Sequence, residues 1–113
     1  MNILEELNMV LNGIAPIETG VFSDVAPDKY IVITPLSDIF ELYGDNRPEY
    51  ETQEARLSLY SKGNYLELKN NVVNALLAAG FTITTRLYIG HENDTGYHHY
   101  AIDAAKVYGL EGI

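Results

Sequence analysis

The densest group of side chains that could do chemistry lies near the end of the chain and comprises His91, Glu92, Asp94, His98 and His99. Imidazole nitrogens and carboxylate oxygens are zinc ligands, and a metal-bound water can hydrolyse a substrate. If residues 90–96 turn the chain, His91 comes near His98, whereas His98 and His99 point to opposite faces of a strand. The spacing matches no known zinc pattern. We therefore interpret the group as a polar hairpin tip without a metal, and keep a metal-dependent hydrolase using these histidines and Asp94 as an alternative.

Other catalytic arrangements have no support in the sequence. Cysteine is absent, which excludes disulfides, a thiolate zinc site and a cysteine nucleophile. No serine lies in a nucleophile elbow, and the nine glycines are scattered and do not form a phosphate-binding loop. We therefore predict a protein that is not an enzyme, with no catalytic residues and no cofactor.

Composition and charge limit the possible partners. The chain has 113 residues, 47% of them apolar and 20% charged, which predicts a single globular domain over residues 1–113. The net charge of −9 argues against tight binding to nucleic acid and against docking on anionic lipid. The run of residues 38–54 contains six acids and one base, so it holds more than half of the charge excess. No apolar run is long enough to span a membrane, and the acidic start is not typical of a signal peptide.

The hydrophobic periodicity predicts six elements. Helical spacing favours helices over residues 2–12, capped by Asn2, and 65–79, capped by Asn64 and ended by Gly80. Alternating or β-branched runs predict strands over 30–36, 53–61, 81–89 and 97–107. Residues 13–28 are expected to be an extended connection, 37–50 a long loop, and 108–113 a frayed end.

These elements predict an α+β fold. The order α-β-β-α-β-β favours a single four-stranded antiparallel sheet with two helices on one face. In residues 53–61, Ala55, Leu57 and Leu59 are expected to face the helices. The other face should then be polar, suited to water or to a partner subunit, and should carry Arg56, Tyr60, Arg86, Tyr88, His99 and the solvated Asp103.

The tyrosine content suggests contacts with proteins. Nine tyrosines and no tryptophan are consistent either with an interface or with ordinary strand propensity. We expect an interface to use the polar sheet face and the acidic loop. The candidate contact residues are Asp45, Arg47, Tyr50, Tyr60, Arg86 and Tyr88.

Several segments resemble a family of small virion proteins from tailed bacteriophages with long non-contractile tails. They are Gly20-Val21-Phe22, Pro27 to Pro35 (PDKYIVITP), Tyr60 to Tyr65 (YSKGNY), and the stretch from Phe81-Thr82-Ile83-Thr84 through Asp94 to Tyr100 (DTGYHHY). The family comprises the tail-completion, tail-terminator and head–tail joining proteins of phages and prophages. The resemblance covers most of residues 18–108 and rests on general pattern and element order.

This resemblance implies a function in assembly. Members of the family are α+β proteins that form rings, usually hexamers, between the tail tube and the head connector, and they have no catalytic residues. We therefore expect a non-catalytic virion protein at the tail–head junction, present in the bacterial cytoplasm before assembly, whose partners are itself, the tail-tube protein and the head-connector protein. An acidic ring would repel phosphates and let DNA slide through its lumen. A small adaptor or regulatory module that binds one host protein is the first alternative.

Overall fold

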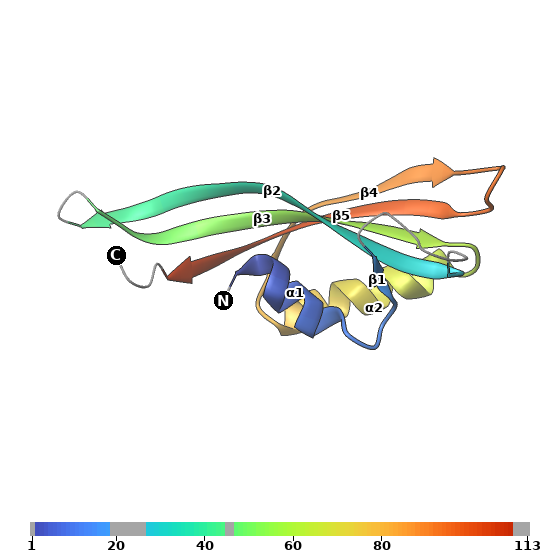
Figure 1. Cartoon of the computed structure of the whole chain (residues 1–113), viewed down its shortest axis with the longest axis horizontal. Helices are drawn as coiled ribbons and strands as arrows, with labels where there is room; N and C mark the ends of the chain where they lie inside the picture. Colours follow the sequence, from blue (N-terminus) through green and yellow to red (C-terminus); the bar gives the residue numbers. More distant parts are fainter. Residues whose placement is uncertain (1, 19–26, 45–46, 110–113) are drawn as a thin grey trace.

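The described residues of the chain form two helices and one curved sheet (Figure 1). The computed structural model describes residues 2–18, 27–44 and 47–109. The elements are α1 (Ile3–Leu11), β1 (Ile17–Glu18), β2 (Lys29–Gly44), β3 (Arg47–Ser61), α2 (Tyr65–Ala78), β4 (Thr82–His91) and β5 (His98–Gly109). The predicted α+β class is confirmed.

The sheet differs in detail from the expected one. It has five strands in the order β1-β2-β3-β5-β4, and it is mixed because β1 runs parallel to β2 while the other pairs are antiparallel. The extra strand comes from the segment that we expected to be a connection, where Ile17 and Glu18 pair with Ile31 and Val32. A two-residue strand is too short to produce an alternating pattern, so the sequence carries no period by which to find it.

Both helices begin at the predicted caps. The Asn2 side chain accepts a hydrogen bond from the Glu5 amide at 2.9 Å, and the Asn64 side chain accepts one from the Glu67 amide at 3.1 Å. Each bond satisfies an amide that has no partner within its own helix. After α2, Gly80 takes a φ of 85°, a left-handed conformation that ends the helix.

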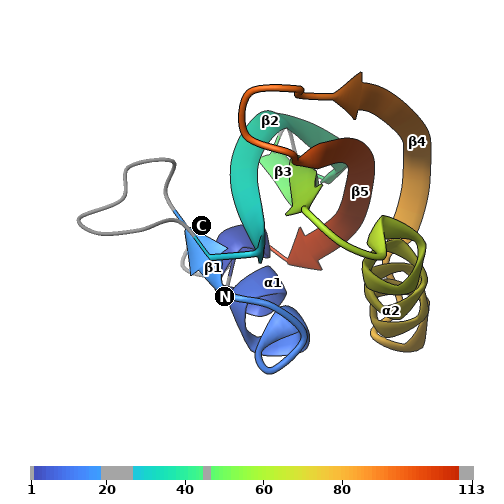
Figure 2. The same cartoon turned by 90° about the vertical axis from the view of Figure 1, so that its right-hand side faces the viewer.

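The core lies between the sheet and the helices, which are on the same face of the sheet (Figures 1 and 2). The helices bury Ile3, Leu7, Leu11, Leu68, Val72 and Leu76, and the strands bury Ile31, Ala55, Leu57, Leu59, Ile102 and Ala104. Along α2, Leu68, Val72 and Leu76 are buried, whereas Leu77 is 57% exposed. We call the sheet surface away from the helices the open face.

The expected loop over residues 37–50 is wrong, because most of it is strand. β2 continues to Gly44 and β3 begins at Arg47, so residues 37–44 and 47–54 form an antiparallel hairpin, which we call the arm. The arm continues past the helices, and the chain is 55 Å long but only 27 Å and 22 Å across (Figure 1). Turn-forming residues suggested a loop, but the pairing of β2 with β3, from Ser37–Glu54 to Gly44–Arg47, overrides that local preference.

Two bulges in β4 overturn part of the predicted face assignment. The register shifts between Ile83 and Thr85 and again between Tyr88 and Gly90. The first bulge places Arg86 opposite Ile102 and Tyr88 opposite Tyr100, and hence on the helix side of the sheet.

At the C-terminal end, β5 extends to Gly109, so residues 108 and 109 are not frayed, and residues 110–113 lie outside the described part.

Candidate functional site

The open face of the arm and of the adjoining end of β5 presents three exposed apolar side chains. Ile39 on β2 and Val107 on β5 both pair with Thr52 on β3, which places them in one row across the strands. Ile39 is 55% exposed and Val107 53%, and Tyr50 is 40% exposed two residues along β3 on the same face. We call Ile39, Tyr50 and Val107 the arm patch. Neighbouring exposed apolar side chains of this kind are typical of a contact surface.

Glu6 of α1 fixes the base of the arm from the helix side. Its carboxylate pairs with the Lys106 ammonium and accepts a hydrogen bond from the Tyr108 hydroxyl at 2.9 Å. Lys106 also donates to the Ala79 carbonyl at the end of α2, at 2.8 Å. Burial and this bond to Glu6 raise the pKa of Tyr108, so the phenol stays protonated. These contacts tie β5 to both helices where the arm leaves the core.

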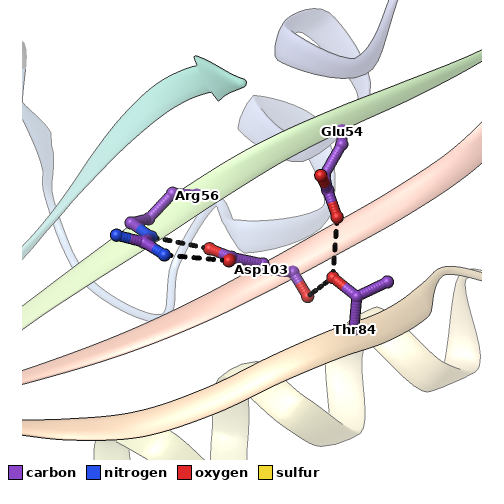
Figure 3. A network of polar contacts seen from close by, with 4 residues as sticks. All are labelled: Glu54, Arg56, Thr84 and Asp103. Atoms are coloured by element: carbon purple, nitrogen blue, oxygen red, sulfur yellow. Dashed lines mark hydrogen bonds and ion pairs between the residues drawn. The ribbon is translucent and has the colours of Figure 1, made fainter. Parts of the chain in front are cut away.

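A polar network crosses the middle of the open face (Figure 3). Arg56 on β3 donates two hydrogen bonds to the Asp103 carboxylate on β5, at 2.7 Å and 3.0 Å. The Thr84 hydroxyl, at the first bulge of β4, lies 2.7 Å from the Glu54 carboxylate and 3.3 Å from the Asp103 carbonyl. The hydrogen bond from Arg56 to Asp103 raises the pKa of Arg56. The network links the three strands at one level.

Asp103 is not solvated as expected, since it is only 6% exposed. Asp103 lies on the open face, as predicted, and is the cross-strand partner of Arg56 on the same face. The guanidinium of Arg56 covers its carboxylate. A buried carboxylate with both oxygens bound to a guanidinium is held in place and is not free to react. Asp103 therefore serves to fix the register of β5 against β3.

An aromatic stack occupies the open face at the far end from the arm. The rings of Tyr30 and Tyr60 stack 4.7 Å apart, and those of Tyr60 and His99 stack 4.3 Å apart. Tyr97 meets Tyr30 edge-on at 5.3 Å and donates a hydrogen bond to the Pro27 carbonyl. Burial raises the pKa of Tyr30 to about 12.

His99 is the unusual member of this stack. Its Nε2 atom is buried and has no hydrogen-bond partner among the described residues. Burial lowers the pKa of this imidazole, because a charged ring would lose its hydration. His99 is therefore a neutral packing residue near pH 7.

The histidines do not converge. The rings of His91 and His98 lie 4.6 Å apart, as the hairpin predicted, and the Tyr88 hydroxyl lies 2.9 Å from Nδ1 of His98. His99 contacts Tyr60 on the opposite face, as expected from its neighbouring position on the strand. In the parts of the chain that the structure describes, no three histidine or acidic side chains are placed to hold a metal ion.

The outer edge of β4 is the second candidate contact surface. β4 is an edge strand of the sheet, next to β5. Three of its apolar side chains are exposed: Leu87 at 52%, Ile89 at 49% and Tyr88 at 41%. Arg86 is exposed beside them. Leu87 pairs with Ala101 and so lies on the open face, whereas Tyr88 contacts Tyr65 of α2 on the helix side.

The structure separates the six predicted contact residues. Tyr50 lies in the arm patch, and Arg86 and Tyr88 lie on the outer strand. Tyr60 is half-buried within the stack of Tyr30 and His99. Arg47 is the first residue of β3, with a side chain that is not described, and Asp45 lies outside the described residues.

Sequence reasoning missed four exposed apolar residues at these two surfaces: Ile39, Leu87, Ile89 and Val107. Leu87 and Ile89 alternate with Arg86 and Tyr88, which were expected on the polar face, so the strand pattern predicts both apolar residues on the helix side. A bulge leaves no mark in such a pattern. Ile39 lay in the expected loop, so its exposure on a strand could not be considered.

No protein-family model and no curated protein matches the chain. In the described residues, no helix is long and apolar enough to cross a membrane.

Proposed function

We propose that this protein is a non-catalytic assembly component of a phage or prophage virion, which forms a ring, in the family's usual case a hexamer, at the junction of tail and head. The observation that carries the proposal is the arm, which continues past the helices and exposes the arm patch. Neither α1 nor α2 covers this hairpin along its length (Figure 1). Such an arm adds little to the core of its own chain, so its use is best explained by contact with other chains.

Charge supports the same proposal. The arm segment is acidic and the whole chain carries −9, which suits contact with basic surfaces on a connector or tube protein. The same sign repels phosphates, so a ring of these subunits would let DNA pass without holding it. The resemblance of residues 18–108 to tail-completion and joining proteins agrees with this function.

The proposal is tested first in particles. A phage or prophage that lacks this gene product should yield filled heads and separate tails in electron micrographs, and expression of the wild-type chain should restore joined particles. Normal joined particles without the protein would overturn the proposal.

A single-residue variant tests the arm patch. Val107→Glu places a carboxylate in the arm patch, where the side chain is already 53% exposed, so the fold should tolerate it. Met9→Glu, on the 65% exposed position of α1, is the matched control. We expect Val107→Glu to fail in restoring joined particles and Met9→Glu to succeed. Equal success of both variants would show that the arm patch makes no contact.

A further inference from the structure

In the part of the chain that the structure describes, the sheet ends in two free edges. β4 forms one end, with β5 as its only neighbour in the described sheet. At the other end, β1 pairs only with Ile31 and Val32, so in the described part of the chain β2 has a free outer edge from Ile33 to Gly44. Unpaired backbone amides and carbonyls along such edges are ready to pair with another strand.

The two edges have different charge. β4 (Thr82–His91) contains Arg86 and no acidic residue. The free part of β2 contains Asp38 and Glu41 and no basic residue. Each edge also carries exposed apolar side chains, Leu87 and Ile89 on β4 and Ile39 on β2. In charge, the β4 edge of one copy is therefore complementary to the β2 edge of another copy, and neither edge is complementary to the same edge of a second copy.

Bulges confine the regular part of each edge. On β4 the two register shifts leave Thr85–Tyr88 as an uninterrupted run, and on β2 the shift between Pro35 and Ser37 leaves Ser37–Gly44 regular. Bulges and proline are the usual protection against unwanted pairing. Here they protect the flanks and leave one short run open on each edge.

We propose that a second copy of this chain binds here head to tail, with the β4 edge of one copy pairing with the free β2 edge of the next. This deepens the proposed function and rests on it, because a contact between two different edges repeats around a ring when the rotation closes. A β4–β4 contact would bring two Arg86 side chains together, and like charges repel. A β2–β2 contact would likewise bring together the acidic residues Asp38 and Glu41 of the two copies. The mixed contact avoids both repulsions.

The test uses one blocking variant for each edge. Leu87→Glu places an acid on the β4 run and Ile39→Glu places one on the β2 run, both at positions that are about half exposed in the single chain. Met9→Glu is again the matched control. Thermal unfolding of each monomer should first show that the fold is intact, and light scattering then gives the mass, with the tail-tube protein added where it is needed to drive assembly.

The expected results follow from the geometry. The wild type and Met9→Glu form assemblies several times the 12.6 kDa chain mass, and each edge variant alone stays at 12.6 kDa, with association weakened about 100-fold or more. An equimolar mixture of the two variants forms a complex of two chains and nothing larger, because only one intact pair of edges remains. This limited complementation is specific to a head-to-tail contact.

Each other outcome overturns a different statement. If the wild type assembles and either variant assembles equally well, or if the mixture stays monomeric, the edge pairing is wrong and the assembly function stands. If Leu87→Glu still forms full rings but no longer binds tail-tube protein, the β4 edge serves that partner and not a second copy. If the wild type is a single chain at every concentration and with tail-tube protein present, the ring itself is wrong.

Discussion

Replacing Leu57 with alanine is a direct test of where the core lies. Leu57 is in the middle of β3, where it pairs with Ile33 on one side and Ile102 on the other, and it is fully buried. Leu87 offers the same chemical change on the same sheet at a position that is 52% exposed. The two leucines therefore separate the effect of burial from the effect of residue type.

The expected magnitudes differ about threefold. Leu→Ala removes three carbon atoms, and at about 0.8 kcal/mol for each buried carbon the transfer free energy is about 2.4 kcal/mol. At Leu57 a cavity adds to this, so the free energy of unfolding should fall by about 3–4 kcal/mol. At Leu87 roughly half of the transfer free energy applies and no closed cavity forms, which gives a loss of about 1 kcal/mol.

Urea unfolding measures both values. With a slope of about 1.5 kcal/mol per molar urea, the midpoint should fall by about 2 M for Leu57→Ala and by less than 1 M for Leu87→Ala. The measurement belongs at a concentration where light scattering gives the mass of one chain, so that association does not add to stability. Equal shifts for the two variants would refute the assignment of the core to the helix side of β3.

Three further perturbations have defined outcomes. Gly80→Ala should lower the free energy of unfolding by about 1–2 kcal/mol, because the residue has a φ of 85°, whereas Gly63→Ala should change it little, since Gly63 has no positive φ and open space around it. The pKa of His99 is near 6.5 in the unfolded chain and lower in the folded chain. Between these two pKa values the unfolded chain binds a proton that the folded chain does not, so the free energy of unfolding of the wild type should fall as the pH falls through this window. His99→Phe should remove that part of the pH dependence, as followed by urea midpoints from pH 7 to pH 5. Tyr108→Phe loses the hydrogen bond to the carboxylate on α1 and should cost about 1–2 kcal/mol in the same assay.

Controls make these outcomes decisive. A His99→Phe variant whose urea midpoint still falls with pH as steeply as that of the wild type would contradict the role of buried His99. If Gly63→Ala destabilises as much as Gly80→Ala, backbone conformation is not the cause. A Tyr108→Phe midpoint equal to that of the wild type would mean that the bond to Glu6 adds nothing to stability.

The sequence was most informative where one local signal sufficed. Asn2 and Asn64 predicted the helix starts because a cap is a contact within a few residues. Alternation in β3 predicted that Leu57 and Leu59 are buried, because a sheet with one covered face has a period of two. These features need no knowledge of distant parts of the chain.

The arm and the outer strand required information that local patterns do not contain. Residues 37–44 and 47–50 are strand because they pair with each other and with residues 51–54 in one hairpin, which β5, from far along the chain, joins only from Tyr50 onward. Arg86 and Tyr88 were assigned to the open face on the alternation of the strand, and one extra residue at Thr84 reversed that assignment. The candidate site lies largely in these two regions, so its composition was only partly predictable.

The central position of β3 also bears on how the chain folds during synthesis. β3 can pair with β2 as soon as both are made, but its second neighbour, β5, follows only after α2 and β4. Until then the growing chain holds a long hairpin with an open apolar strand, a species prone to aggregate. The acids of residues 38–54 give such hairpins a like charge, so nascent chains on neighbouring ribosomes repel each other until β5 completes the sheet.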